Sequence, residues 1–225
     1  FRNRYAIMVR RTFSGRSINL VTGYKNTAEL SANLKTFSYR VAKEECLDLP
    51  PKVYTKRVVE LTDEQKDMYN TMKRAAIAHH DGKLMTTESA LTTLMRLHQI
   101  TCGTFKADDG TITPLKNNRI TALTDCLEEV NGKVIIWATY REDIKKIVET
   151  LKKAYGEDST VEYHGGVDTT LRQENIVQFQ DVEGPTRYFV GNAQTGGYGI
   201  TLTAANTVIY YSNNYDLEKR LQSED

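Results

Sequence analysis

From Lys133 onward, short apolar segments alternate with amphipathic ones, and this alternation restricts the possible folds more than any other feature of the chain. The pattern predicts strands at 134–138, 160–163, 188–190 and 208–211, with helices at about 141–154 and 169–180 between them. Apolar strands separated by helices are typical of a parallel sheet covered on both faces. We therefore expect an α/β fold in this part of the chain.

Ligands of such sheets bind at the carboxyl ends of the strands. Three segments are expected to emerge there, 139–141, 164–166 and 192–199, so three loops should converge on one edge. The third contains Gly196, Gly197 and Gly199, and glycine lets a backbone adopt positive φ or pass close to a ligand. The plainer interpretation is that these glycines only shape a tight turn between two strands.

The preceding residues predict helices. Thr62 and Gln65 have the spacing of a capping box, and apolar residues continue at helical spacing to Ile100, so 62–101 should form a helical hairpin. A further amphipathic helix is expected at 120–130. Pro50 and Pro51 interrupt any helix. The predicted division is a basic, helical tail or linker at 1–50, a helical hairpin region at 51–112, and an α/β lobe at 113–225.

Charge and cysteine content limit the possible partners. The net charge is only +1, but residues 1–60 contain 12 Lys and Arg against 5 Asp and Glu. This asymmetry permits a polyanionic partner. The three cysteines have no C-x-x-C spacing, so a reduced, intracellular, cytoplasmic setting is the simplest interpretation. No apolar run is long enough to span a membrane. Because the chain starts at Phe1 without methionine, we expect it to be a piece of a larger protein.

Several catalytic motifs are missing from the sequence. It contains no G-x-x-x-x-G-K-[ST] phosphate loop and no nucleophile elbow. His79 and His80 resemble a metal pair, but neighbouring helical residues point about 100° apart, so a solvated surface is favoured and no metal site is predicted. His98 lies on the apolar side of its helix, as a hydrogen-bonded core histidine does.

An ordered set of segments carries a family resemblance. These segments are 134–140, 163–166 followed by Arg172 and Phe179, and 194–205, with 49–52, 61–65 and 94–100 upstream. In order and spacing they resemble the second RecA-like lobe, the helicase C-terminal lobe, of SWI/SNF-type DNA translocases in helicase superfamily two. Bacterial and phage members are the most similar. The likeness covers nearly the whole chain and implies a RecA-like three-layer sheet preceded by a helical region.

The resemblance also implies a function. The parent protein would be an ATP-dependent DNA translocase or helicase that uses ATP and Mg²⁺, with ATP bound between this lobe and a first RecA-like lobe. The fragment alone is expected to be inactive and to bind no cofactor tightly. Its arginine finger is expected beyond Asp225. DNA, most simply duplex DNA bound independently of sequence, is the expected partner.

Individual residues inherit roles from this resemblance. Those expected to contact DNA are Thr139, Arg141, His164, Gly165, Asn192, Thr195 and Gly196, and those expected at the nucleotide are Gly197, Gly199 and Gln222. Side-chain and backbone donors of this kind bind phosphate oxygens without reading sequence. Arg141 and Arg172 are equally well explained as solvated helix residues.

The sequence also departs from the family pattern. Gln194 and Thr195 stand where lysine and alanine are frequent, which removes one possible phosphate contact. Residues 212–215 stand where an acidic residue and paired tryptophans are frequent, which leaves a stacking role there in doubt. Two other functions stay open: a non-catalytic nucleic-acid-binding or protein-interaction module, and a sugar-nucleotide transferase on a doubly wound sheet.

Overall fold

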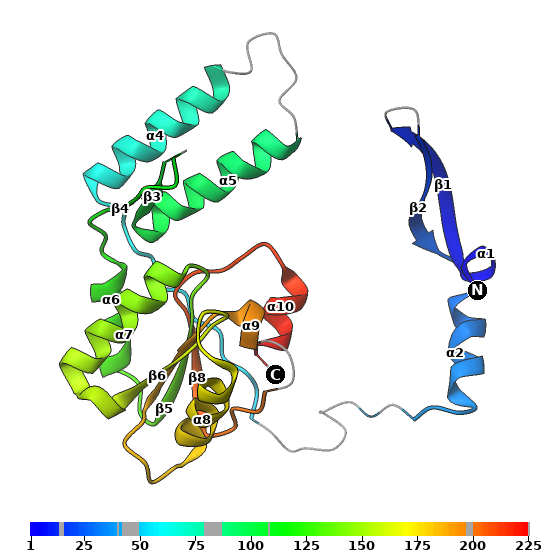
Figure 1. Ribbon diagram of the computed structural model, residues 1–225. Helices are drawn as coiled ribbons and strands as arrows, with labels where there is room; N and C mark the ends of the chain where they lie inside the picture. Colours follow the sequence, from blue (N-terminus) through cyan, green and yellow to red (C-terminus); the bar gives the residue numbers. More distant parts are fainter. Residues whose placement is uncertain are drawn as a thin grey trace. The chain divides into compact units, whose positions relative to one another are not determined.

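The computed structural model describes residues 1–13, 16–39, 41, 50–78, 87–107, 109–196 and 200–224. The chain divides into two compact units, Phe1–Thr55 and Lys56–Asp225 (Figure 1). The second unit contains both the expected helical region and the expected α/β lobe. Within the described residues, no helix is both long enough and apolar enough to cross a membrane.

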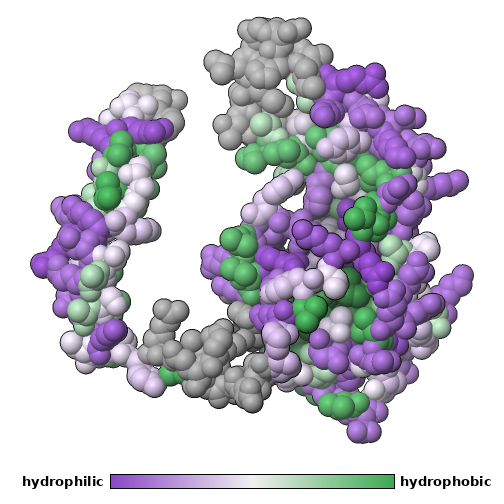
Figure 2. All heavy atoms as spheres, turned by 180° about the vertical axis from the view of Figure 1, so that it is seen from behind, coloured by the Kyte–Doolittle hydropathy of each residue, from purple (hydrophilic) through white to green (hydrophobic). Residues whose placement is uncertain are grey.

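The first unit is built around an antiparallel hairpin. A short helix α1 (Arg2–Tyr5) leads into strands β1 (Ala6–Phe13) and β2 (Arg16–Tyr24), and helix α2 (Thr27–Lys35) follows. The prediction of a helical segment at 1–50 is therefore wrong for residues 6–24. Val9 pairs with Leu20 across the ribbon, so apolar residues at alternate positions share one face. These side chains lie at the surface of the unit (Figure 2).

The second unit begins with the predicted helical hairpin. Helices α4 (Asp63–Ala78) and α5 (Thr87–Cys102) pack against each other. The short strands β3 (Thr104–Lys106) and β4 (Ile112–Pro114) follow as an antiparallel pair. The segment that contains His79 and His80 lies outside the described residues, so the interpretation of that pair stays a prediction.

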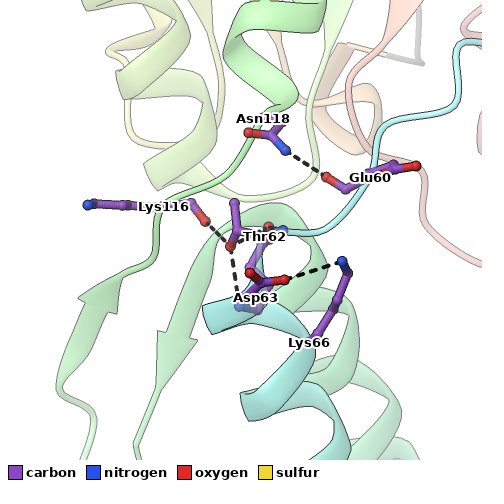
Figure 3. A network of polar contacts seen from close by, with 7 residues as sticks. Glu60, Thr62, Asp63, Lys66, Lys116 and Asn118 are labelled. Atoms are coloured by element: carbon purple, nitrogen blue, oxygen red, sulfur yellow. Dashed lines mark hydrogen bonds and ion pairs between the residues drawn. The ribbon is translucent and has the colours of Figure 1, made fainter.

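The capping box at the start of α4 is confirmed. The Thr62 N–H donates to Gln65 Oε1 at 3.1 Å, and the Gln65 N–H donates to Thr62 Oγ1 at 3.3 Å. The Thr62 hydroxyl also donates to the Lys116 carbonyl at 3.0 Å, and Asn118 Nδ2 donates to the Glu60 carbonyl (Figure 3). The cap therefore also attaches the helical hairpin to the chain that enters the lobe.

The lobe contains a four-stranded parallel sheet in the order β6-β7-β5-β8. The strands are β5 (Lys133–Trp137), β6 (Thr160–Tyr163), β7 (Tyr188–Gly191) and β8 (Ala205–Tyr210), and the helices are α6 (Arg119–Glu128), α7 (Arg141–Tyr155), α8 (Thr169–Gln180), α9 (Ala193–Gly196) and α10 (Leu217–Gln222), with a 3-10 turn η1 (Glu157–Ser159). The strands and long helices predicted from residue 120 onward are confirmed, as is the RecA-like three-layer α/β fold.

Alternation along β5 divides the core into two layers. Val134 and Ile136 point toward α6 and α7, whereas Ile135 and Trp137 point toward α8. All four side chains are buried, as is expected of a central strand covered on both faces. The side chains of β5 therefore pack into both core layers, one on each face of the sheet.

The cap at Thr62 gives a first test. Thr62→Ala removes the acceptor for the Gln65 N–H and the donor to Lys116, so the free energy of unfolding should fall by about 1 kcal/mol. Thr121→Ala, at an exposed position of α6, is the matched control and should change it by less than about 0.5 kcal/mol. Urea unfolding followed by circular dichroism measures both. Equal effects of the two substitutions would contradict the role of the cap.

Candidate functional site

The indole of Trp137 occupies the carboxyl edge of the sheet. It is almost fully buried, meets the Phe189 ring edge-on at 5.9 Å between centroids, and donates from Nε1 to the Ser223 carbonyl at 3.3 Å. A Cβ atom added at Gly196 would lie 2.6 Å from Trp137 Cη2, and one at Gly191 would lie 3.0 Å from Trp137 Cζ3. Both glycines are therefore required by packing against this ring.

The position of Gly196 adds a second role to the one expected for it. Gly196 is buried at the end of α9, and its missing side chain makes room for Trp137. Gly197 and Gly199 lie outside the described residues, so their expected place at the nucleotide stays a prediction. Thr195 is half-buried, and its N–H donates to the Asn192 carbonyl at 2.9 Å.

Hydrogen bonds join the loops that follow three of the strands. Asn192 Nδ2, after β7, donates to the Thr139 carbonyl, after β5, at 2.8 Å. The Thr139 N–H donates to Ser212 Oγ, after β8, at 2.8 Å. Asn192 Oδ1 also accepts from the Gln194 N–H at 2.8 Å. The predicted convergence on one edge is confirmed for the loops at 139–141 and 192–199, and the loop that contains Ser212, which was not among the predicted three, joins them.

The loop after β6 presents exposed backbone beside Arg141 of α7. His164 Nδ1 accepts from the Gly166 N–H at 3.0 Å, and its Nε2 lies 3.4 Å from a Glu162 carboxylate oxygen. Both ring nitrogens are thus engaged within the loop. Gly165 is exposed, and a Cβ built on it would lie 3.8 Å from Arg141 Nη2. The exposed Arg141, at the start of α7, therefore lies beside the exposed backbone of this loop.

Arg172 of α8 is less exposed than Arg141 and has contacts within the lobe. Its guanidinium lies 5.7 Å from the centre of the Tyr163 ring, and its Nη2 donates to Thr169 Oγ1 at 3.0 Å. Its Nε is buried and has no hydrogen-bond partner among the described residues. The guanidinium thus packs against the Tyr163 ring, and the choice between a DNA contact and a solvated helix residue stays a prediction for Arg172.

Helix α10 closes the edge beyond Trp137. Arg220 lies with its guanidinium carbon 3.2 Å from the centre of the Tyr210 ring and donates from Nη1 to Asn213 Oδ1 at 2.9 Å. Gln222 donates from Nε2 to Glu218 Oε1 at 3.1 Å, while its Oε1 is buried without a partner among the described residues. A shallow hollow beside Arg220 is lined by residues of all three joined loops.

The end of α5 docks beneath the same loops. His98 Nδ1 lies 2.9 Å from the Tyr140 hydroxyl, and its Nε2 lies 3.7 Å from Cys102 Sγ. The prediction of a hydrogen-bonded histidine is confirmed. Arg119 donates from Nε to the Thr101 carbonyl at 2.9 Å and from Nη1 to the Tyr211 carbonyl. These contacts tie the helical hairpin to the segments that follow β5 and β8.

Buried ionisable groups surround this junction. Burial raises the pKa of Asp143 to about 7, and the nearby Arg119 guanidinium only partly opposes that rise. Asp143 Oδ2 has no hydrogen-bond partner among the described residues, which agrees with a carboxyl group that binds a proton readily. Burial likewise raises the pKa of the Cys102 thiol to about 11, and burial together with Arg119 lowers the pKa of His98.

Sequence reasoning missed several residues that shape the site. Trp137 lies in the segment 134–140, but the sequence assigns it no role. The sequence pattern around Asp143, Arg119 and Arg220 is that of ordinary helix residues. Within the described residues, no group of three or more His, Cys, Asp or Glu side chains could hold a metal ion.

Two family models match the chain. Residues 116–225 match the helicase conserved C-terminal domain, and residues 1–105 match the SNF2-related domain. Together the two matches leave only residues 106–115 uncovered.

Individual relatives agree with these models. The chain is 26% identical over 214 residues to the putative ATP-dependent helicase/translocase YwqA of Bacillus subtilis, which covers 89% of this chain and 23% of YwqA. It is 31% identical over 121 residues to the ATP-dependent helicase fft2 of Schizosaccharomyces pombe, covering 52% of this chain and 9% of fft2. The chain thus spans less than a quarter of the length of either relative.

A solved structure supports the fold. The SWI2/SNF2 ATPase C-terminal domain of Sulfolobus solfataricus superposes with a TM-score of 0.55 at 23% identity, covering 68% of each chain. At this identity the likeness establishes a shared RecA-like architecture.

Gly196 offers a test of the packing around Trp137. Gly196→Ala places a methyl group against the buried indole, so the free energy of unfolding should fall by about 1–3 kcal/mol. Gly165→Ala is the control, because its Cβ meets only ordinary contacts and its effect should stay within about 0.5 kcal/mol. Urea unfolding with tryptophan fluorescence reports on both. A neutral Gly196→Ala would show that this ring does not constrain the loop.

Asp143 offers a pH test. Its folded-state pKa is raised to about 7, above the ordinary value of 3.8, so the folded chain loses stability as pH rises from about 4 to 7. Asp143→Asn removes this loss and should unfold at higher urea than the parent chain at pH 8, with a difference of about 1–3 kcal/mol that shrinks toward pH 5. Asp125→Asn, at an exposed position of α6, is the control. A pH-independent difference for Asp143→Asn would contradict the assignment.

Proposed function

Residues 1–105 and 116–225 belong to the SNF2-related and helicase C-terminal families, which makes this a SWI/SNF-type chain of helicase superfamily two, and from that premise we propose that its α/β lobe is the second motor lobe of an ATP-dependent DNA translocase. In this proposal the lobe contributes contacts to the DNA backbone and one wall of an ATP cleft. The parent protein hydrolyses ATP only when a first lobe faces this one.

One observation carries the proposal. The loops after β5, β7 and β8 are joined through Asn192, Thr139 and Ser212, and exposed Arg141 lies beside the exposed Gly165 backbone at the same sheet edge. An exposed guanidinium next to free backbone suits a phosphate group, and such contacts do not read base sequence. A translocating protein needs contacts of this kind, because every step places it on a different sequence.

The joined loops also suggest how position is transmitted. A phosphate held at Arg141 acts on the start of α7 and, through Thr139, on the loops after β7 and β8. Thr139 and Asn192 then serve mainly as the frame, because their side chains bond to neighbouring loops, and the Thr195 N–H is bonded within its own loop to the Asn192 carbonyl. His164 shapes its turn through Gly166 and leaves the Gly165 backbone exposed.

The described residues fit one side of a nucleotide site. Gln222 has a buried Oε1 without a partner in the described part of the lobe, an acceptor that a nucleotide N–H group could meet. The sequence has no phosphate loop, so the phosphates of ATP and their Mg²⁺ would be held by the first lobe. ATP hydrolysis supplies the free energy for movement. Gly197 and Gly199 are assigned to this wall from the family likeness.

The experiment is a comparison of ATP hydrolysis. The gene product that joins this chain to an SNF2 lobe with a phosphate loop should hydrolyse ATP faster when duplex DNA is added, and residues 1–225 alone should show no DNA-stimulated turnover. Robust turnover by residues 1–225 would contradict the two-lobe account. Salt-dependent DNA binding without any ATPase in the longer protein would instead favour a non-catalytic binding module.

Arg141 gives the sharper prediction. Arg141→Ala should weaken duplex DNA binding about equally for different sequences and reduce the slope of log K against log salt by about 0.9, the value for one lost phosphate contact. Lys145→Ala, one turn later on the exposed side of α7, removes the same charge away from the loop edge and should leave the slope unchanged. Fluorescence anisotropy at several salt concentrations measures both slopes.

The result can go against the proposal in two ways. Equal slopes for Arg141→Ala and the unaltered protein would remove Arg141 from the interface. Equal losses for Arg141→Ala and Lys145→Ala would mean that only the overall charge of the lobe matters, and not the loop edge.

A further inference from the structure

The first unit carries a concentrated positive charge. Residues 1–39 contain seven Lys and Arg and one acidic residue, Glu29, although the whole chain has a net charge of only +1. Glu29 is already engaged, since it lies 2.6 Å from Arg4 and accepts from the Tyr5 hydroxyl at 3.2 Å. The hairpin β1–β2 therefore has no acidic side chain of its own to neutralise its arginines.

The two faces of this hairpin differ in chemistry. Arg10 pairs with Asn19 and Thr12 pairs with Ser17, so these four side chains share one face, and the two hydroxyls lie 3.1 Å apart. We name this the polar face. The pairs Val9–Leu20, Arg11–Ile18 and Phe13–Arg16 occupy the opposite register positions, where apolar residues stand together with two arginines. The side chains of the four polar-face residues and of Val9, Arg11, Ile18 and Leu20 are exposed within the unit.

We propose that the polar face of the β1–β2 hairpin is a second nucleic-acid contact, which binds the phosphate backbone of duplex DNA. Guanidinium, hydroxyl and amide groups are the side-chain donors that proteins use on phosphate oxygens. The hairpin places one guanidinium, one amide and two hydroxyls on a single face, and the positive charge of the unit complements a polyanion. A two-stranded ribbon is also narrow enough to enter the major groove of B-form DNA.

The polar face of the hairpin lies in the first unit and shares no residue with the sheet edge of the lobe, which lies in the second unit. The inference rests on the proposed nucleic-acid partner, and it adds a contact that the lobe loops do not provide. Phosphates are shared by DNA and RNA, but the deep, narrow major groove of duplex RNA does not admit side chains, so duplex DNA is the expected partner.

The two neighbouring arginines supply a matched test. In the protein that contains the whole chain, Arg10→Ala should lower the slope of log K against log salt for duplex DNA by about 0.9. Arg11→Ala removes the same charge from the adjacent residue on the opposite face and should lower it by much less. Arg10→Lys, which keeps the charge, should restore the slope and shows that the altered hairpin still folds.

Each outcome is decisive. Equal losses for Arg10→Ala and Arg11→Ala, or no loss for either, would overturn the assignment to the polar face while leaving the lobe interface intact. A loss confined to duplex RNA would overturn the choice of partner. If the unaltered protein binds neither nucleic acid, both this inference and the proposed function fail, whereas a normal effect of Arg141→Ala beside a silent Arg10→Ala removes only this one.

Discussion

The burial of one indole ring sets the geometry of the functional edge. Trp137 ends the central strand, and its ring fills the space that Gly191 and Gly196 leave without side chains. The same ring meets Phe189 in the core below and donates to the Ser223 carbonyl beyond the edge. Because a protein interior is close-packed, moving this ring would displace strand, loop and terminal helix together.

The helical region and the lobe form one body because polar side chains link them. Gln65, almost fully buried, closes the cap of α4 and donates to the Ile100 carbonyl at the end of α5. Arg119 then connects α5 to the chain that follows β8. A buried donor left without a partner costs about 1–3 kcal/mol, so these links resist separation. The hairpin α4–α5 is therefore connected through Arg119 to the loop that follows β8.

The two basic features of the chain lie in different units and differ in construction. At the lobe edge a single exposed arginine stands beside backbone that a glycine leaves open. On the first unit, a two-stranded ribbon presents several donors on one face, and residues 6–24 contain no Asp or Glu. Both suit phosphate, and neither offers the paired base-reading geometry that would recognise a sequence. The proposed translocating function requires contacts of this kind, which do not depend on base sequence.

The sequence by itself determined the parallel sheet, the long helices of the lobe, the cap at Thr62 and the family, because hydrophobic period and motif spacing are local properties. It misjudged residues 6–24, which form an antiparallel ribbon in a segment that was predicted to be a helical tail or linker. Only the tertiary structure decided that Gly196 makes room for Trp137 and that Asp143 is buried. Those properties depend on residues distant in sequence, whose approach no local pattern encodes.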